Sequence, residues 1–382
     1  MALNGIWWEC FWWQKSGQAG ARLDRALTIG PQVSNLPHHN SAADRRVCKG
    51  VCAVLMLAAY PCAAQTEAEK LIEAGHWKRA RALVEANRQP SHDALTQFLL
   101  SQIHNAFGDR ESPLPLAEKA VALDGHVAKY HRQLAEVTGV MAQHAGLLEQ
   151  FLLARRFRHE IDAALALDPG DVQALRDLME FYLLAPGLAG GDKDKAQATA
   201  RRIASVDAVQ GFLAQARLAQ AAGDPAREEA MLRKAVDAGP SHYCARVTLA
   251  EFLLSRGHWE AAREQAEIAV RIDGSRVDAF GLLAAIYARC GRSGDLDAVL
   301  ATAEKRVPDD FSPYYRAAEA LLAAEQDLQR AERYFRRYLA AEPEGNAPSL
   351  QDAGRKLDQV LEKVRADRLK GISGTRGTLG PG

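Results

Sequence analysis

YCARVTLAEFLLSRGHWEAAREQAEIAVRIDGSR fills residues 243–276, and VDAFGLLAAIYARCGRSGDLDAVLATAEKRV follows at 277–307. The two segments share one register, because Gly257 and Gly291 lie 34 residues apart and each follows an apolar, alanine-rich stretch. A fixed period of this length is typical of stacked helical repeats. Other pairs with the same spacing are Leu249 and Leu283, Ala250 and Ala284, and Ala269 and Ala303.

With the glycine set as position 15, four consecutive units keep this register, starting at Val209, Tyr243, Val277 and Phe311. In this respect the chain resembles the tetratricopeptide repeat family. That family places small residues at positions 8, 20 and 27, where helices approach, and large residues at 4, 7, 11 and 24, where gaps are filled. The resemblance implies an all-α fold, a right-handed α-solenoid of stacked antiparallel helix pairs.

The register loosens upstream but continues, with two insertions. About ten extra residues lie around Val140 to Leu153, and a Gly-rich loop after Ala185 is enlarged by three. We expect both insertions to lie between helices, so that the stack survives them. The layout is similar to that of exported bacterial tetratricopeptide proteins. The expected solenoid covers 65–345, with units near 66–93, 94–127, 128–171, 172–208, 209–242, 243–276, 277–310 and 311–345.

The carboxyl end departs from the repeat pattern. Residues 346–368 predict one further helix, but the expected glycine and second helix do not follow. This helix would cap the last apolar face, as terminal repeats must, or it belongs to a truncated unit. Residues 369–382 are rich in Gly and Thr, which predicts a flexible tail.

Segment 45–64 has the order of a secretory signal peptide. Three basic residues precede an apolar run at 51–60, and small residues precede a cleavage site after Ala64. The run is shorter than the roughly 20 residues that span a bilayer. We therefore predict cleavage before Gln65 and export, to the periplasm of a Gram-negative bacterium. The alternatives are a membrane anchor, a buried helix or, through Cys62, a lipoprotein signal.

Residues 1–44 fit no export signal. Four tryptophans, at positions 7, 8, 12 and 13, are followed by a polar stretch with Gly, Pro and Asn. One interpretation is that translation starts downstream and that 1–44 is a mis-annotated leader. The other is an aromatic anchor at a membrane interface. Under both interpretations we expect this segment to be disordered.

Charge argues against nucleic acid as a partner. The whole chain has 48 basic and 48 acidic residues. Residues 1–64 hold six of the basic and three of the acidic groups, so the remainder has 42 against 45, a net of −3. A surface that neutralises phosphates would need an excess of Lys and Arg.

Two cysteines, Cys244 and Cys290, would remain after cleavage. They occupy repeat positions 2 and 14, and equivalent helices stack side by side, so they differ by about 18 Å along the helix axis. A disulfide needs Cα atoms within about 7 Å. We therefore predict two free thiols.

No motif indicates catalysis. The Gly-rich segment 187–195 lacks the Gly-Lys-Ser/Thr of a phosphate loop, so we interpret it as structural, with Asp192 or Asp194 helping to start the next helix. The histidines lack the spacing of a zinc site, and no Gly-x-Ser-x-Gly elbow occurs. We predict no enzyme activity, no metal site and no cofactor.

In the solenoids that the chain resembles, first-helix positions 2, 5, 9, 12 and 13 line a concave groove. Members that clamp a C-terminal carboxylate use Lys and Asn at several of these positions, and the residues here include neither, which argues against that ligand class. For each residue, an ordinary exposed side chain is the alternative. The candidate partner-binding residues are Arg176, Glu180, Leu213, Arg217, Gln220, Glu251, Leu254, Asp278, Arg289, Tyr315 and Glu319.

The resemblance implies a non-catalytic scaffold or adaptor for protein–protein interaction, which binds an extended peptide or a helix of another protein in this groove. The alternative is a structural subunit of a cell-envelope or secretion assembly, acting through its convex face and its ends. After cleavage of the signal peptide, we expect no stable membrane span.

Overall fold

The computed structural model describes residues 65–86 and 93–375, and within these ranges it consists of helices and turns, without strands. The all-α solenoid expected from the repeat pattern is confirmed. No helix in the same ranges is both long enough and apolar enough to cross a membrane. The predicted leader 1–44, the predicted signal peptide 45–64 and the tail from 376 onward lie outside the described residues.

Consecutive helices pair into hairpins, and each hairpin packs against the next. The first pair is a helix at 65–73 and α3 (Trp77–Ala86). The following pairs are α4 (Ala94–Ala106) with α5 (Pro113–Leu123), α6 (Ala128–His144) with α7 (Leu147–Leu167), α8 (Val172–Leu184) with α9 (Lys193–Val206), α10 (Ala208–Ala221) with α11 (Pro225–Ala238), α12 (Tyr243–Ser255) with α13 (Trp259–Ile272), α14 (Asp278–Arg289) with α15 (Ser293–Arg306), and α16 (Ser312–Ala324) with α17 (Leu328–Leu339).

The periodic glycines form the turns inside the hairpins. Gly257 and Gly291 have φ angles of +77° and +66°, a left-handed conformation that L residues with a side chain seldom adopt. The amide of Gly257 donates to the Leu254 carbonyl at 3.1 Å, and the amide of His258 donates to the Leu253 carbonyl at 2.9 Å. These bonds satisfy carbonyls at the end of α12, so the chain can reverse within two residues.

Alanines make the contacts between helices. Ala250, Ala262, Ala269 and Ala284 are fully buried, because their small side chains let neighbouring helices approach closely. Phe280 packs into the same apolar cluster and is also buried. The repeat spacing therefore places the small and large side chains of the core in alternation.

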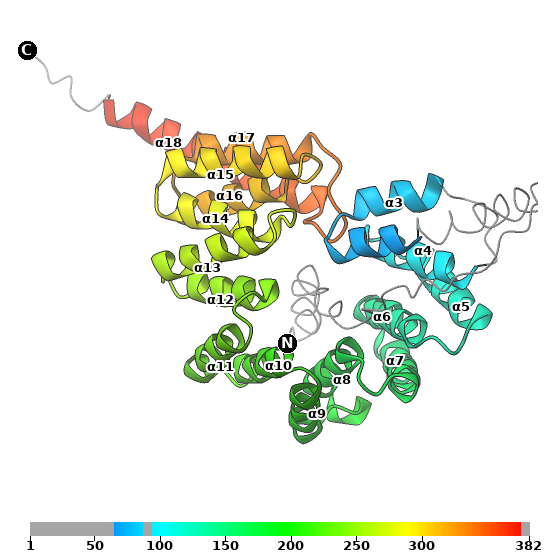
Figure 1. Cartoon of the computed structure of the whole chain (residues 1–382). Coiled ribbons are helices and arrows are strands. Elements are labelled where there is room, and N and C mark those ends of the chain that lie inside the picture. Colours follow the sequence, from blue (N-terminus) through cyan, green and yellow to red (C-terminus); the bar gives the residue numbers. More distant parts are fainter. Residues whose placement is uncertain (1–64, 87–92, 376–382) are drawn as a thin grey trace, which may run out of the picture.

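The hairpins follow one another around a ring, and the two ends of the array meet (Figure 1). The first helices α8, α10 and α14 lie nearer the middle of the ring than their partners α9, α11 and α15. At the meeting point, α3 and α4 lie beside the segment that joins α17 to α18 (Leu350–Thr375). The groups that bond across this junction are 230 to 266 residues apart in the sequence.

The insertion in the third unit does not lie between helices, contrary to our expectation. It lengthens both helices of the hairpin, to 17 residues in α6 and 21 in α7, with a turn at 145–146. The inserted sequence keeps forming intrahelical hydrogen bonds, so the hairpin projects beyond its neighbours. At its tip Leu147, Leu148 and Leu152 are 81%, 78% and 58% exposed.

The Gly-rich loop between α8 and α9 is tightly packed. It contains a short 3₁₀ turn, η2 (Gly187–Ala189), and a Cβ on Gly191 would lie 1.7 Å from the Ala185 carbonyl oxygen. Asp192 caps α9 by accepting from the amides of Asp194 and Lys195, so the expected helix start is confirmed for Asp192. Its pKa is lowered chiefly by the hydrogen bond from the Lys195 amide.

The last helix, α18, packs against α17 and α16. Ala353, Val360 and Val364 are buried in the apolar cluster that it shares with them. The helix starts at Leu350, after Pro348, and continues to Thr375, past the end that the sequence indicated. Both cysteines of the described residues are free thiols, Cys244 buried and Cys290 exposed.

Candidate functional site

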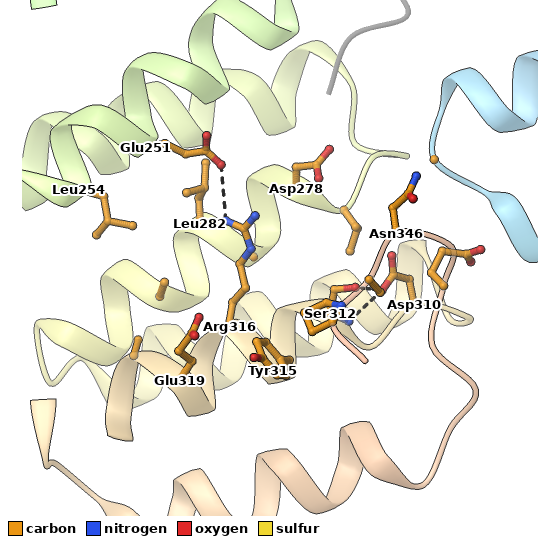
Figure 2. A pocket seen from close by; sticks show the side chains of 18 of the residues that line it. Glu251, Leu254, Asp278, Leu282, Asp310, Ser312, Tyr315, Arg316, Glu319 and Asn346 are labelled. Atoms are coloured by element: carbon orange, nitrogen blue, oxygen red, sulfur yellow. Dashed lines mark hydrogen bonds and ion pairs between the residues drawn. The ribbon is translucent and has the colours of Figure 1, made fainter. Parts of the chain in front are cut away.

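A cavity of about 700 Å³ opens on the inner face of the ring, over α12, α14 and α16 (Figure 2). One wall of the cavity is formed by both ends of the array. Gly75 and Trp77 come from the first hairpin, and residues 344–348 follow α17. The cavity therefore exists only where the two ends of the array meet. Six of the eleven candidate residues line it, namely Glu251, Leu254, Asp278, Arg289, Tyr315 and Glu319.

The junction that closes this wall is hydrogen-bonded through the backbone and side chains. The Lys78 amide donates to Glu344 Oε1 at 2.6 Å, and the Asn346 amide donates to the Ala106 carbonyl at 2.7 Å. Gly345 lies against the Trp77 indole so closely that a Cβ there would be 2.6 Å from the ring carbon Cγ. Only glycine fits between the two ends of the chain at this point.

Charged pairs flank the junction on its more exposed side. Arg79 makes two hydrogen bonds to the Asp309 carboxylate, at 2.6 and 2.7 Å. Arg81 pairs with Glu342 at 2.8 Å. These contacts fix the register in which α3 meets the segment after α17.

The other five candidate residues border a separate hollow of about 20 Å³ farther along the inner face. That volume holds about one water molecule. Arg217 Nε lies 2.9 Å from Glu180 Oε1, and both side chains are only 10–11% exposed. Burial raises the pKa of Glu180, while the Arg217 charge opposes that rise. The members of this group are Arg176, Glu180, Leu213, Arg217 and Gln220.

Arg316 lines the cavity but was not among the residues predicted from the sequence. It stands at repeat position 6, and the prediction used positions 2, 5, 9, 12 and 13 only. Its guanidinium Nη1 lies 3.6 Å from Glu251 Oε1, so α16 is linked to α12 across α14 (Figure 2). The crossing passes over Gly281, where a Cβ would lie 2.9 Å from Arg316 Cδ. The sequence signal that could have indicated this path is Gly281 itself, a residue without a side chain at a groove position of α14. Burial raises the pKa of Glu251 to about 7, and Arg316 opposes this rise.

Three carboxyl groups gather at the closed end of the cavity. The pKa of Asp278, of Asp310 and of Glu344 is raised, in each case mainly by burial. For Glu344 the pKa reaches about 7. The charge of Asp310 adds to the rise at both other groups, so Asp310 repels each of them. The Ser312 amide donates to Asp310 Oδ1 at 2.8 Å.

Helix α18 contacts two of the residues that line the cavity. The Tyr315 hydroxyl donates to Asp352, and Lys356 pairs with Glu319. The Lys356 ammonium also lies 5.2 Å from the centre of the Tyr315 ring. Tyr315 and Glu319 are thus held by α18. The other four candidate residues of the cavity have no such contact to it, namely Glu251, Leu254, Asp278 and Arg289.

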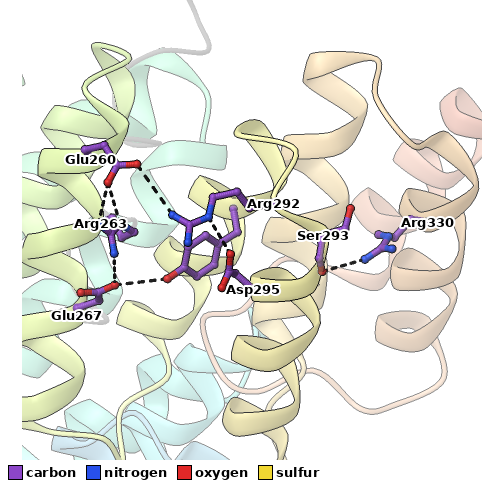
Figure 3. A network of polar contacts seen from close by, with 8 residues as sticks. Glu260, Arg263, Glu267, Arg292, Ser293, Asp295 and Arg330 are labelled. Carbon is purple, nitrogen blue, oxygen red and sulfur yellow. Dashed lines mark hydrogen bonds and ion pairs between the residues drawn. The ribbon is translucent and has the colours of Figure 1, made fainter.

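A second polar network lies away from the cavity, between α13, α15 and α17 (Figure 3). Arg263 contacts Glu260 at 2.7 Å and Glu267 at 2.8 Å. Arg292 contacts Asp295 at 2.7 Å and Glu260 at 4.0 Å. All five of these charged groups have a charged partner. Among the described residues, no group of His, Cys, Asp and Glu is arranged to hold a metal ion.

No protein-family model and no curated protein matches the sequence. Among solved structures, yeast Tom70 is similar over 78% of this chain and 60% of its own length, with 15% identity and a TM-score of 0.52. PilW, a widely conserved type IV pilus biogenesis factor, matches over 55% of this chain and 93% of its own, with 21% identity and a TM-score of 0.37.

A thermophilic TPR protein of Thermus thermophilus matches over 60% of this chain and 100% of its own, with 16% identity and a TM-score of 0.34. The likeness to Tom70 concerns the fold alone. Together with the 34-residue register and the stacked hairpins, it shows that this chain has a fold of the tetratricopeptide-repeat type.

Proposed function

We propose that this protein is a non-catalytic scaffold that binds a segment of another protein on the inner face of its ring. The observation that carries the proposal is the cavity of about 700 Å³ over three consecutive first helices. Its lining combines apolar side chains such as Leu254 with charged ones such as Asp278 and Arg289. Mixed linings of this kind fix the orientation of a bound chain through a few polar contacts.

The dimensions favour an extended peptide or a single helix as the occupant. The floor of the cavity, α14, has 12 residues and is therefore about 17 Å long. About five residues of extended chain cover that length. A folded domain would not enter a space of about 700 Å³ that the junction closes on one side.

Selection of peptides from a random library against the purified protein tests this proposal. Leu254→Arg places a charge in the cavity and should weaken the selected peptides at least about tenfold, as the loss of one buried contact implies. Arg233→Glu alters the exposed, Glu229-paired arginine of α11 and is the matched control. Failure to select any peptide, or equal binding by both variants, overturns the proposal.

We also propose that the chain is exported. The support is the order of basic, apolar and small residues at 45–64, which predicts signal cleavage before Gln65. The expected compartment is the periplasm. Sequencing the amino terminus of the protein isolated from its native host checks this. A new amino terminus at Gln65 is the expected result, and a protein that still carries residues 1–44 contradicts it.

The exposed tip of α6–α7 favours a second candidate, a structural subunit of an envelope or secretion assembly. Leu147 and Leu148 are the most exposed of its apolar residues, and exposed apolar patches mark interaction sites. If this role holds, Leu147→Ser with Leu148→Ser should release the protein from a sedimenting assembly. Leu254→Arg should leave that assembly intact, which separates the two candidates.

A further inference from the structure

Three carboxyl groups, of Asp278, Asp310 and Glu344, line the closed end of the cavity. The Asp278 carboxyl accepts from its own backbone amide and is attracted by the charges of Arg276 and Arg316. Glu344 is 95% buried, and its Oε2 has no hydrogen-bond donor, although Oε1 accepts from the Lys78 amide. A buried carboxylate oxygen without a donor destabilises the fold, because it has lost its hydrogen bonds to water. An occupant that donates to it would recover this free energy.

The charge balance of the lining points the same way. Five carboxyl groups and two guanidinium groups line the cavity. Arg316 forms an ion pair with Glu251, and Glu319 forms one with Lys356. The charges of Arg276 and Arg316 lower the pKa of Asp278. Burial raises that pKa by more, so the net shift is upward. Asp278, Asp310 and Glu344 are the remaining carboxyl groups, against Arg289 as the remaining guanidinium of the lining. The Lys78 charge acts on Asp310 and Glu344 as well, but burial still dominates the pKa of both.

We propose that this end of the cavity binds a cationic side chain, Lys or Arg, of the partner segment. The proposal rests on the function proposed above and names the chemistry of its partner. An ammonium or guanidinium group has several donors and no acceptor, so it can satisfy three clustered carboxylates at once. It would also end the repulsion among them. The Trp77 ring, which lines the same end, offers an apolar surface to the aliphatic part of the side chain.

The site also depends on the closed ring. Trp77 belongs to the first hairpin, whereas Asp310 and Glu344 follow α15 and α17. A cation held between them contacts both ends of the array, so its binding and the closure of the ring stabilise each other. An open ring would separate Glu344 from the Lys78 amide and expose it to water.

The experiment takes the tightest peptide selected as above and replaces each of its Lys and Arg residues in turn by norleucine. Norleucine keeps the aliphatic stem of lysine and removes its charge. Affinities are measured by fluorescence anisotropy for the full chain, for Glu344→Gln and for Asp278→Asn with Glu344→Gln. Glu267→Gln removes a carboxyl group from the outer network and is the matched control.

One basic residue of the peptide should matter to the wild-type protein and to the control by at least about tenfold, as charge-assisted hydrogen bonds imply. In the double variant the same replacement should change affinity less than about twofold, because two of the three carboxyl groups are gone and only Asp310 is left. If the double variant fails to fold, Glu344→Gln alone should show a reduced dependence.

Two outcomes overturn the inference. Peptides that bind but contain no basic residue, or whose basic residue matters equally to all variants, remove the cationic subsite and leave the scaffold function standing. The absence of any peptide sensitive to Leu254→Arg removes both proposals together.

Discussion

Asp309 accepts two hydrogen bonds from the Arg79 guanidinium, 230 residues away in the sequence. Both side chains are partly exposed, at 40% for Arg79 and 28% for Asp309. A pair in contact with water contributes at most about 1 kcal/mol. The closure of the ring must therefore depend mainly on the buried contacts beside this pair, where Gly345 meets Trp77 and the Asn346 amide reaches α4.

Gly345→Ala should open the ring. The added Cβ would lie 2.6 Å from Trp77 Cγ, so α3 and the segment after α17 have to separate. Small-angle X-ray scattering should show a larger radius of gyration than for the wild type. Gly294→Ala is the control, because a Cβ at Gly294 meets nothing within 4 Å. An unchanged radius for Gly345→Ala contradicts the closed ring.

Gly281→Ala should displace Arg316 from Glu251. The new Cβ would lie 2.9 Å from Arg316 Cδ, and the 3.6 Å contact between the two charges depends on that path. Replacing a helical glycine by alanine normally stabilises a protein by about 0.5–1 kcal/mol. Gly354→Ala in α18, where a Cβ has open space, should show this gain. Thermal unfolding should show no such gain for Gly281→Ala.

Glu344→Gln should remove part of the pH dependence of stability. Burial raises the pKa of Glu344 from 4.5 to about 7. Because the folded value is the higher one, the stabilising contribution is complete below about pH 4.5 and is lost as the pH rises through 7. The wild type should therefore be less stable than the variant at pH 8, by about 3 kcal/mol, and similar to it near pH 4.5. Urea unfolding at both pH values measures the difference, and an equal difference at both contradicts the assignment.

Ala284→Leu should destabilise the repeat stack by about 1–3 kcal/mol, the usual effect of overpacking a core. Ala284 is fully buried at position 8 of its unit, where α14 meets its neighbours. Ala298→Leu in α15 adds the same atoms at an exposed position and should change stability by less than about 0.5 kcal/mol. Equal effects in chemical unfolding would mean that position 8 does not limit the packing.

The sequence alone was sufficient for the repeat architecture, because that architecture depends on contacts between neighbours. Gly257 and Gly291 indicate the turns, and Ala250 and Ala284 indicate the close contacts between helices. The two members of each pair are 34 residues apart. The same register placed Leu254, Asp278 and Arg289 on the inner face. These are properties of a helical hairpin and of the hairpin beside it.

The contacts of individual groove residues could be determined only from the tertiary structure. Arg217 and Glu180 carry opposite charges at groove positions, yet they pair with each other and leave little space. Arg316 stands outside the expected positions and enters the cavity because Gly281 gives it a path. The partner of a long side chain depends on which neighbour lies within a few ångströms, and a repeat position does not specify that.

The sequence by itself therefore determined an all-α solenoid and the side of each first helix that faces inward. Only the tertiary structure decided that the array closes on itself. Closure depends on the small rotation between successive hairpins, which adds up over the whole array and which no single repeat encodes. It brings Trp77 to Gly345 and the Lys78 amide to Glu344, and so builds the end of the cavity in which the three carboxyl groups lie.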